Sequence, residues 1–245
     1  MMGIPDWFHW LAIASLALAL LCAGSIAIHE TRNPQHMWIM NLVWPLVALF
    51  GSVIALWAYY RYGLLATHKA MAEASKRKDK PANDRKPFAA SVAVAASHCG
   101  SGCALGDLVA EFVALAFPAV AVAFGWHWLF AEKIFAVWVL DFILAFGFGI
   151  AFQYFTIAPM RGLGLRDGLI AAAKADTLSL TAWQVGMYGL MAIAQFWLFR
   201  SVFGVNVDAG MPEFWFAMQV AMIAGFVTAY PVNWWLLRAG LKEKM

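Results

Sequence analysis

The residues best suited to chemistry in this chain are two thiols, an imidazole and two acids. His98, Cys99 and Cys103 lie within six residues, and Asp107 and Glu111 follow at intervals of four. On a helix, the two cysteines and the two acids would form one stripe. Thiolate and imidazole ligands select Cu(I) or Zn(II). We predict a soft-metal site at the His and Cys residues. Thiol–disulfide chemistry and a closely packed helix with inert thiols are the alternatives.

Three acids lie inside apolar segments, where ionisable groups are costly and usually face a cavity or a partner. They are Asp107, Glu111 and Asp141. We predict that they couple protons or a cation to the movement of the metal. The alternative is a protonated acid that forms a hydrogen bond between two helices.

The chain has twelve methionines, and four of them form pairs at helical spacing. Met187 pairs with Met191, and Met218 pairs with Met222, each at an interval of four. Thioethers are soft, neutral ligands that could pass Cu(I) through a membrane. Gln184 lies on the same helical face as the first pair and is predicted to be part of a polar pathway. The alternative is that these methionines fill gaps between packed helices.

A second group of soft ligands is expected at the outer ends of the first two spans. It comprises His29, His36 and Met37, which are predicted to capture a metal ion there. An ordinary hydrogen-bonded surface role for the histidines is the alternative. His29 or His36 could also pair with His127 around a haem b, the alternative cofactor.

Composition places the chain in a membrane, since 63% of its residues are hydrophobic and 13% are charged. Several apolar runs reach the ~20 residues that a transmembrane helix needs. We predict an all-α, polytopic membrane helical bundle. Its six spans are expected at residues 8–28, 37–60, 104–126, 134–157, 180–199 and 213–237.

The predicted organisation is a two-helix hairpin (1–60), a flexible basic linker (61–87) and a four-helix membrane domain (88–245). Residues 88–97 are too few to cross a bilayer, so we expect a half-helix that breaks at the following glycines. Residues 164–178 are predicted to form an interfacial helix whose acids, Asp176 among them, face water.

Orientation follows from the positive-inside rule. With six crossings, fourteen of the seventeen Lys and Arg residues lie on one side. This distribution predicts that both termini are cytoplasmic. The chain has no Gly-x-x-x-x-Gly-Lys-Ser/Thr phosphate loop, which argues against nucleotide-driven pumping. The basic linker is better explained by topology and anionic lipid than by nucleic acid.

Several long runs resemble one known family over about residues 90–245. The runs are Ser-His-Cys-Gly-Ser-Gly-Cys from residue 97, Phe-Gln-Tyr-Phe-Thr-Ile-Ala-Pro-Met-Arg-Gly from 152, Lys-Ala-Asp-Thr-Leu-Ser-Leu-Thr-Ala-Trp-Gln-Val-Gly-Met-Tyr from 174, Tyr-Pro-Val-Asn-Trp-Trp from 230 and the terminal Lys-Glu-Lys-Met. They resemble a bacterial membrane family catalogued as domain of unknown function 4396. The resemblance implies an association with copper-handling proteins, and it adds weight to Asp176 as part of a polar pathway.

We therefore expect a multi-pass protein of the bacterial inner membrane that binds and moves a soft metal ion, Cu(I) first, rather than an enzyme. Its expected partners are the lipid bilayer, the metal ion, copper-handling proteins and further copies of itself, but no nucleic acid. A membrane redox protein, using haem b or thiol–disulfide exchange, and a non-catalytic accessory subunit are the alternatives.

Overall fold

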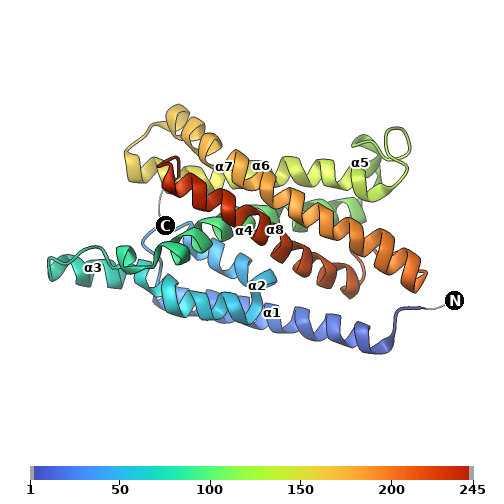
Figure 1. Cartoon of the computed structure of the whole chain (residues 1–245), viewed down its shortest axis with the longest axis horizontal. Coiled ribbons are helices and arrows are strands. Elements are labelled where there is room, and N and C mark those ends of the chain that lie inside the picture. The colour runs from blue at the N-terminus through green and yellow to red at the C-terminus, as the bar shows by residue number, and fades with distance from the viewer. Residues whose placement is uncertain (1–2, 243–245) are drawn as a thin grey trace.

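The computed structural model describes residues 3–242 as helices that run along one long axis (Figure 1). The elements are α1 (Asp6–Arg32), α2 (Met40–Tyr62), η1 (Gly63–Ala66), α3 (His68–Lys76), η2 (Ala82–Arg85), α4 (Phe88–Ala116), α5 (Pro118–Ala123), α6 (Lys133–Arg161), α7 (Leu165–Ala192), η3 (Ile193–Phe203) and α8 (Pro212–Arg238). Six helical segments are long and apolar enough to cross a membrane, which confirms the predicted fold class. The predicted linker is partly helical, because it contains α3 and η2.

Helix α4 begins at Phe88, sixteen residues earlier than predicted, and no break follows. The prediction of a break was wrong because the glycines serve close packing instead. A Cβ atom at Gly106 would lie 2.6 Å from the backbone nitrogen of Ala145, and one at Gly102 would lie 2.9 Å from the Cα atom of Gly149. Small residues let helix backbones approach each other closely in a membrane. The glycines therefore bring α4 against α6.

Helix α7 also differs from the prediction. Residues 165–203 form one uninterrupted helical segment, of which Ile193–Phe203 is π-helical. The prediction of a separate interfacial helix at 164–178 was therefore wrong. Asp176 was expected to face water, but only 1% of it is exposed, because it lies against Cys99 of α4 and against Lys242, which follows α8.

Helix α2 folds back on itself at Ser52, whose φ of 45° and ψ of −125° are not helical. The rings of Trp44 and Tyr59 lie 5.6 Å apart, whereas a straight helix would separate these positions by about 22 Å. Gln35 and Thr67, which flank the segment, form a β-bridge. Residues 40–51 and 53–62 are thus two short helices of a hairpin that enters the bundle and returns to the same end.

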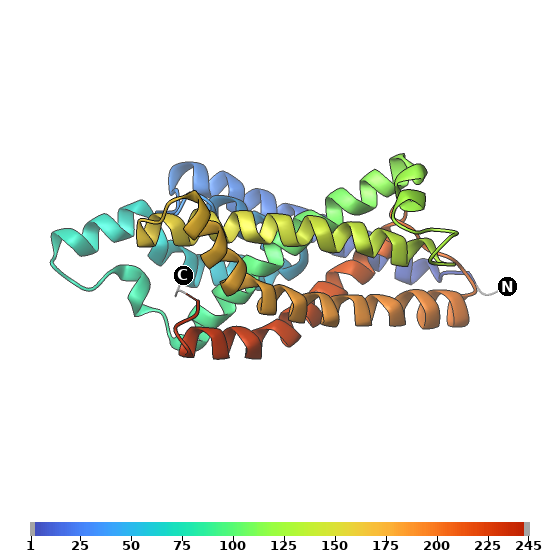
Figure 2. The same ribbon diagram turned by 90° about the horizontal axis from the view of Figure 1, so that it is seen from above.

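Helices α1 and α8 run in parallel, since His9 contacts Glu213 at 2.6 Å and Ser15 contacts Gln219 at 2.8 Å. Together with the fold-back of α2, this places the first and last described residues at opposite ends of the long axis (Figures 1 and 2). The arrangement differs from the prediction that both termini lie on one side. The sequence prediction counted α2 as a crossing, and the hairpin returns instead.

Nearly all the basic residues gather at the end of the bundle where α1 finishes, which we call the basic end. It also holds α3 and the last turn of α8 (Figure 1). Of the Lys and Arg residues that the structure describes, only Lys133 and Arg200 lie at the other end. Helix α4 is the centre of the bundle, because 61% of an apolar 18-residue stretch of it is buried, against at most 39% of the corresponding stretch in the other long helices.

Candidate functional site

One face of α4 carries the predicted stripe of chemical groups, and all of it is buried. Cys99, Cys103, Asp107 and Glu111 follow one another at successive turns from the basic end toward the other end. Cys103 lies between two groups of charged or polar side chains. Asp107 and Asp141 are close enough to affect it electrostatically from one side, and so are Cys99 and Asp176 from the other. The stripe therefore links two polar clusters through the interior of the bundle.

The acidic cluster lies where α4, α6 and α7 meet. Asp107 and Asp141 lie close enough for the charge of each to act on the other, whereas both polar atoms of the buried Gln184 side chain have no hydrogen-bond partner among the described residues. The Tyr188 hydroxyl donates to Asp141 Oδ2 at 2.6 Å. Two carboxyl groups so close together cannot both remain ionised at low cost, so the pair is suited to holding a single exchangeable proton.

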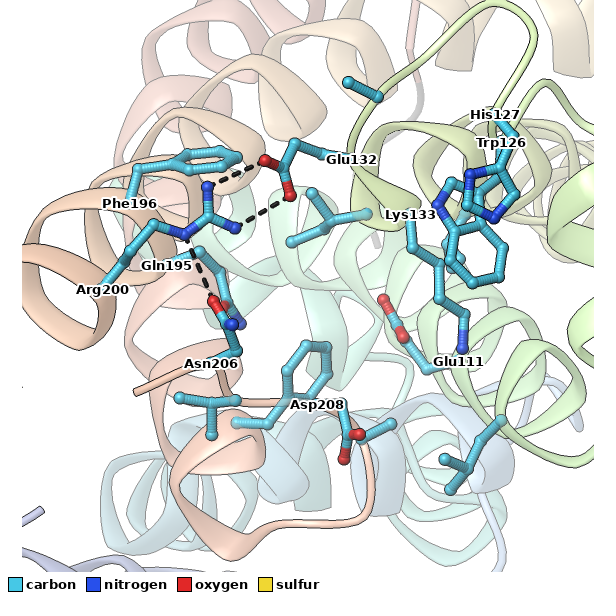
Figure 3. Close-up of a pocket in the computed structure, with 17 residues that line it drawn as sticks. Glu111, Trp126, His127, Glu132, Lys133, Gln195, Phe196, Arg200, Asn206 and Asp208 are labelled. Atoms are coloured by element: carbon cyan, nitrogen blue, oxygen red, sulfur yellow. Dashed lines mark hydrogen bonds and ion pairs between the residues drawn. The ribbon is translucent and has the colours of Figure 1, made fainter. Parts of the chain in front are cut away.

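Glu111 connects the acidic cluster to a cavity of about 440 Å³ at the end opposite the basic end. Figure 3 shows the side chains of Glu111 and Lys133 near each other in the cavity, where Arg200 pairs with Glu132. Two nitrogens of the guanidinium bind the two carboxylate oxygens at 2.8 Å each. These hydrogen bonds lower the pKa of Glu132. The cavity thus presents charged side chains of both signs to Glu111, and Asp208 adds a further acid (Figure 3).

The second polar cluster surrounds Cys99 near the basic end, and we call it the Lys242 cluster. Besides Cys99 and Lys242 it contains Asp176, Ser179 and Asn233, all buried. The Lys242 ammonium lies 2.7 Å from Cys99 Sγ, 2.9 Å from Asn233 Oδ1 and 3.4 Å from Asp176 Oδ1.

The remaining contacts of this cluster fix the thiol. Cys99 Sγ also contacts Asp176 Oδ1 and accepts a hydrogen bond of 3.0 Å from the Ser179 hydroxyl. Asn233 Nδ2 donates to Ser179 at 2.6 Å. Burial opposes the charged form of Lys242, but Cys99 and Asp176 outweigh it, so the pKa of Lys242 is raised and its amine is an ammonium.

His98 does not join the two thiols. Its Nε2 lies 3.1 Å from the Thr156 hydroxyl on α6, whereas Cys99 faces α7 and the segment after α8. Its Nδ1 is buried and has no hydrogen-bond partner in the described part of the chain. Within residues 3–242, no three His, Cys, Asp or Glu side chains are grouped so that they could hold a metal ion. The predicted triad of His98, Cys99 and Cys103 is therefore not assembled in this conformation.

The four paired methionines are buried, as a pathway or a packed core would require. Met222 Sδ accepts a hydrogen bond from the Trp183 indole at 3.4 Å, and Met218 and Met222 line a largely apolar cavity of about 430 Å³ that Asp107 also lines. Met187 and Met191 are fully enclosed in the same hydrophobic core. Both pairs pack among aromatic and aliphatic side chains.

The predicted outer group lies at the basic end instead. His29 Nδ1 is 2.9 Å from the Tyr59 hydroxyl, and His36 lies 3.4 Å from His68 in the linker, next to Met37. The prediction placed His29, His36 and Met37 at the other end because it treated α2 as a crossing. His127 lies beside the cavity at the opposite end, so the positions of these histidines do not support the alternative of a haem between His127 and His29 or His36.

The tip of the α2 hairpin adds a feature that the sequence did not reveal. Gln219 Nε2 donates to the Leu49 carbonyl at 2.7 Å, and the Phe50 ring packs on Trp183 at 5.6 Å. Both tip residues line the cavity that Asp107 also lines. Broken helices of this kind often mark binding sites near the bilayer midplane in transporters.

Sequence reasoning missed Tyr188, Ser179, Asn233 and Lys242. All four fall within the runs that carry the family resemblance, because Ser179 and Tyr188 lie in the run from 174, Asn233 lies in the run from 230 and Lys242 begins the terminal run. Those runs were the available signal. Lys242 lay outside every predicted span, and nothing in the sequence indicated that it would be buried.

The chain belongs to the family described as Domain of unknown function (DUF4396), whose model matches residues 90–242. The match contains both polar clusters and excludes α1 and the α2 hairpin. No match was found among the curated proteins or among the solved structures.

Proposed function

We propose that this protein moves a monovalent cation across a bacterial inner membrane, Cu(I) first, and that buried acids couple protons to the movement. The observation that carries the proposal is the buried stripe of α4. Two thiols and then two acids follow one another there, all buried, and side chains from α6, α7 and the segment after α8 meet them. Buried ionisable groups in a membrane protein mark ion pathways and proton relays.

The acidic cluster supports the coupling step. Asp107 and Asp141 share one region, Glu111 leads from it to the 440 Å³ cavity, and Tyr188 orients Asp141. A proton held between the two aspartates would leave when a cation arrives, because the pair cannot hold both charges cheaply. We infer that this exchange is the coupling device.

The thiols support the choice of a soft ion. Cys99 and Cys103 lie one turn apart and are buried, and sulfur ligands favour Cu(I) over hard cations. The methionines at the edge of the Asp107 cavity would add neutral sulfur ligands nearby. The basic end would face the cytoplasm, as the positive-inside rule requires.

Uptake of Cu(I) by proteoliposomes tests the proposal. We expect the wild-type protein to accumulate Cu(I), and we expect Asp107→Asn to reduce the rate at least tenfold. Asp167→Asn removes an exposed carboxylate from the start of α7 and is the matched control, which should retain the wild-type rate. Equal rates for wild type, Asp107→Asn and protein-free vesicles would contradict the proposal.

A further inference from the structure

Lys242 follows the last helix, yet its side chain is buried inside the bundle. Residues 238–241 are exposed, whereas only 3% of Lys242 is exposed. Gly240, with a φ of 70°, turns the chain back, and the amide of Lys242 reaches the Leu236 carbonyl at 3.3 Å. The segment is thus held by backbone hydrogen bonds to the last turn of α8 and by the buried side chain of Lys242.

The ammonium of Lys242 occupies a cage of four acceptors from three helices. Cys99 Sγ and the Ala95 carbonyl belong to α4, Asp176 Oδ1 to α7 and Asn233 Oδ1 to α8, at distances of 2.7 to 3.4 Å. An ammonium has three hydrogens to donate, so four acceptors exceed its capacity. Such a set of ligands surrounds a cation from several sides.

Parts of this cage are positioned by contacts other than those of Lys242. Ser179 bonds both Cys99 and Asn233, and Asn233 Nδ2 also donates to the Ala229 carbonyl at 2.9 Å. The second oxygen of Asp176, Oδ2, is buried and has no hydrogen-bond partner among the described residues. This oxygen lies against α6, since a Cβ atom at Gly149 would be 2.7 Å from it.

We propose that Cys99, Asp176, Asn233 and the Ala95 carbonyl form a binding site for a soft monovalent cation, and that Lys242 occupies it as a tethered competitor. The incoming ion displaces the ammonium, and the segment after α8 then leaves the site. When Cys99 enters as a thiol, its proton is released to solvent, and no oxidation state changes. This inference rests on the proposed function for the identity of the ion.

Ag(I) binding to the full-length protein in detergent tests the site. In a Cys22→Ser, Cys103→Ser background, Cys99 is the remaining cysteine. We expect Lys242→Ala to bind Ag(I) at least tenfold more tightly than the Lys242 parent in calorimetry. Lys242→Arg, which keeps the charge, should bind as weakly as the parent, and Lys174→Ala, which removes an exposed lysine from α7, should match the parent. Cys99→Ser should abolish binding.

A second measurement needs no variant at position 242 and covers the case in which Lys242→Ala fails to fold. Ag(I) should increase acetylation of Lys242 in the Cys99 parent, read by mass spectrometry, and should have no effect in Cys99→Ser. The inference would be overturned if Ag(I) affinity were equal with and without Lys242, or if Cys99→Ser still bound Ag(I). It would also be overturned if Ag(I) did not change the acetylation of Lys242. Neither assay involves Asp107 or Asp141, so a failed transport assay is distinguishable from a failed site.

Discussion

The hydroxyl of Tyr188 donates a hydrogen bond of 2.6 Å to Asp141 Oδ2, and this contact orients the Asp141 carboxyl between α6 and α7. Asp107 comes from α4 and Asp141 from α6, so a small rotation of either carboxyl would separate them. A buried hydrogen bond to a charged group contributes about 1.5–3 kcal/mol. Tyr188 is therefore a positioning residue for the acidic pair.

Tyr188→Phe should leave the protein folded and slow cation uptake about tenfold, which corresponds to about 1.4 kcal/mol at the acidic pair. The measurement is the initial rate of Cu(I) uptake by proteoliposomes. Tyr154→Phe, on α6 near the basic end, is the control and should retain the wild-type rate. A wild-type rate in Tyr188→Phe would show that the hydroxyl has no part in coupling.

Lys242 also predicts how the stability of the site depends on pH. Its pKa is raised above the usual 10.5, because Cys99 and Asp176 outweigh burial. A group with a raised pKa contributes stability that is complete below its unfolded value and is lost only as pH rises through the folded value. The contribution of the buried Lys242 ammonium to the free energy of unfolding should therefore be constant from about pH 6 to 9.

The corresponding measurement compares the unfolding free energies of wild type and Lys242→Ala across this pH range. Removing one partner of a buried ion pair costs about 3–5 kcal/mol, so we expect a constant difference of that order. A difference that disappears as pH rises from 6 to 9 would contradict an ammonium at this position.

At the scale of elements, the spacing on α4 predicted which residues share a face, because helical periodicity depends only on the sequence of that helix. The partners were not predictable in the same way. Asp141, Asp176 and Asn233 lie on three other helices, and their meeting points depend on how these helices rotate and pack. The glycines of α4 were misinterpreted for the same reason, since their role lies in the backbone of α6.

Gly106 tests the packing of α4 on α6. An added Cβ would lie 2.6 Å from the Ala145 nitrogen, and backbone cannot move aside as a flexible side chain can. We expect Gly106→Ala to lower the unfolding free energy by about 1–3 kcal/mol. Gly147→Ala is the matched control, because nothing lies within 4 Å of its Cβ, and it should not destabilise the protein in a thermal unfolding scan.

Ser52 tests the fold-back of α2. Its positive φ of 45° suits glycine, which lacks the Cβ that makes this conformation costly. Ser52→Gly should therefore raise the unfolding free energy by about 1 kcal/mol, while Ser52→Val should lower it. If α2 were a straight helix, the order would be reversed, since glycine would weaken it.

At the scale of the whole molecule, the sequence predicted the membrane class and the six apolar segments, because hydropathy alone determines both. It did not predict that α2 returns, since its two halves together have the length of one crossing. The count of Lys and Arg residues on the two sides did not reveal that α2 returns. Placing Arg32 on the basic side changes the large excess of positive charge there by only one residue. Local features such as Gly51 and Ser52 were too weak a signal of a reversal.

The topology is testable directly. Reporters fused to each end of the chain should lie on opposite sides of the membrane, with the C-terminal one in the cytoplasm. An alkaline phosphatase fusion should be active at the N-terminal end and inactive at the C-terminal end. Equal behaviour of both fusions would contradict the hairpin and would favour six full crossings.

We propose that the buried stripe of α4 couples protons to the movement of a soft cation. Internal pH recorded during Cu(I) uptake by proteoliposomes tests it most directly. We expect the wild-type protein to change the internal pH in a fixed ratio to the Cu(I) taken up, and we expect Asp141→Asn to lose the pH change. Cu(I) uptake with no pH change in the wild type, or an unaltered ratio in Asp141→Asn, would contradict it.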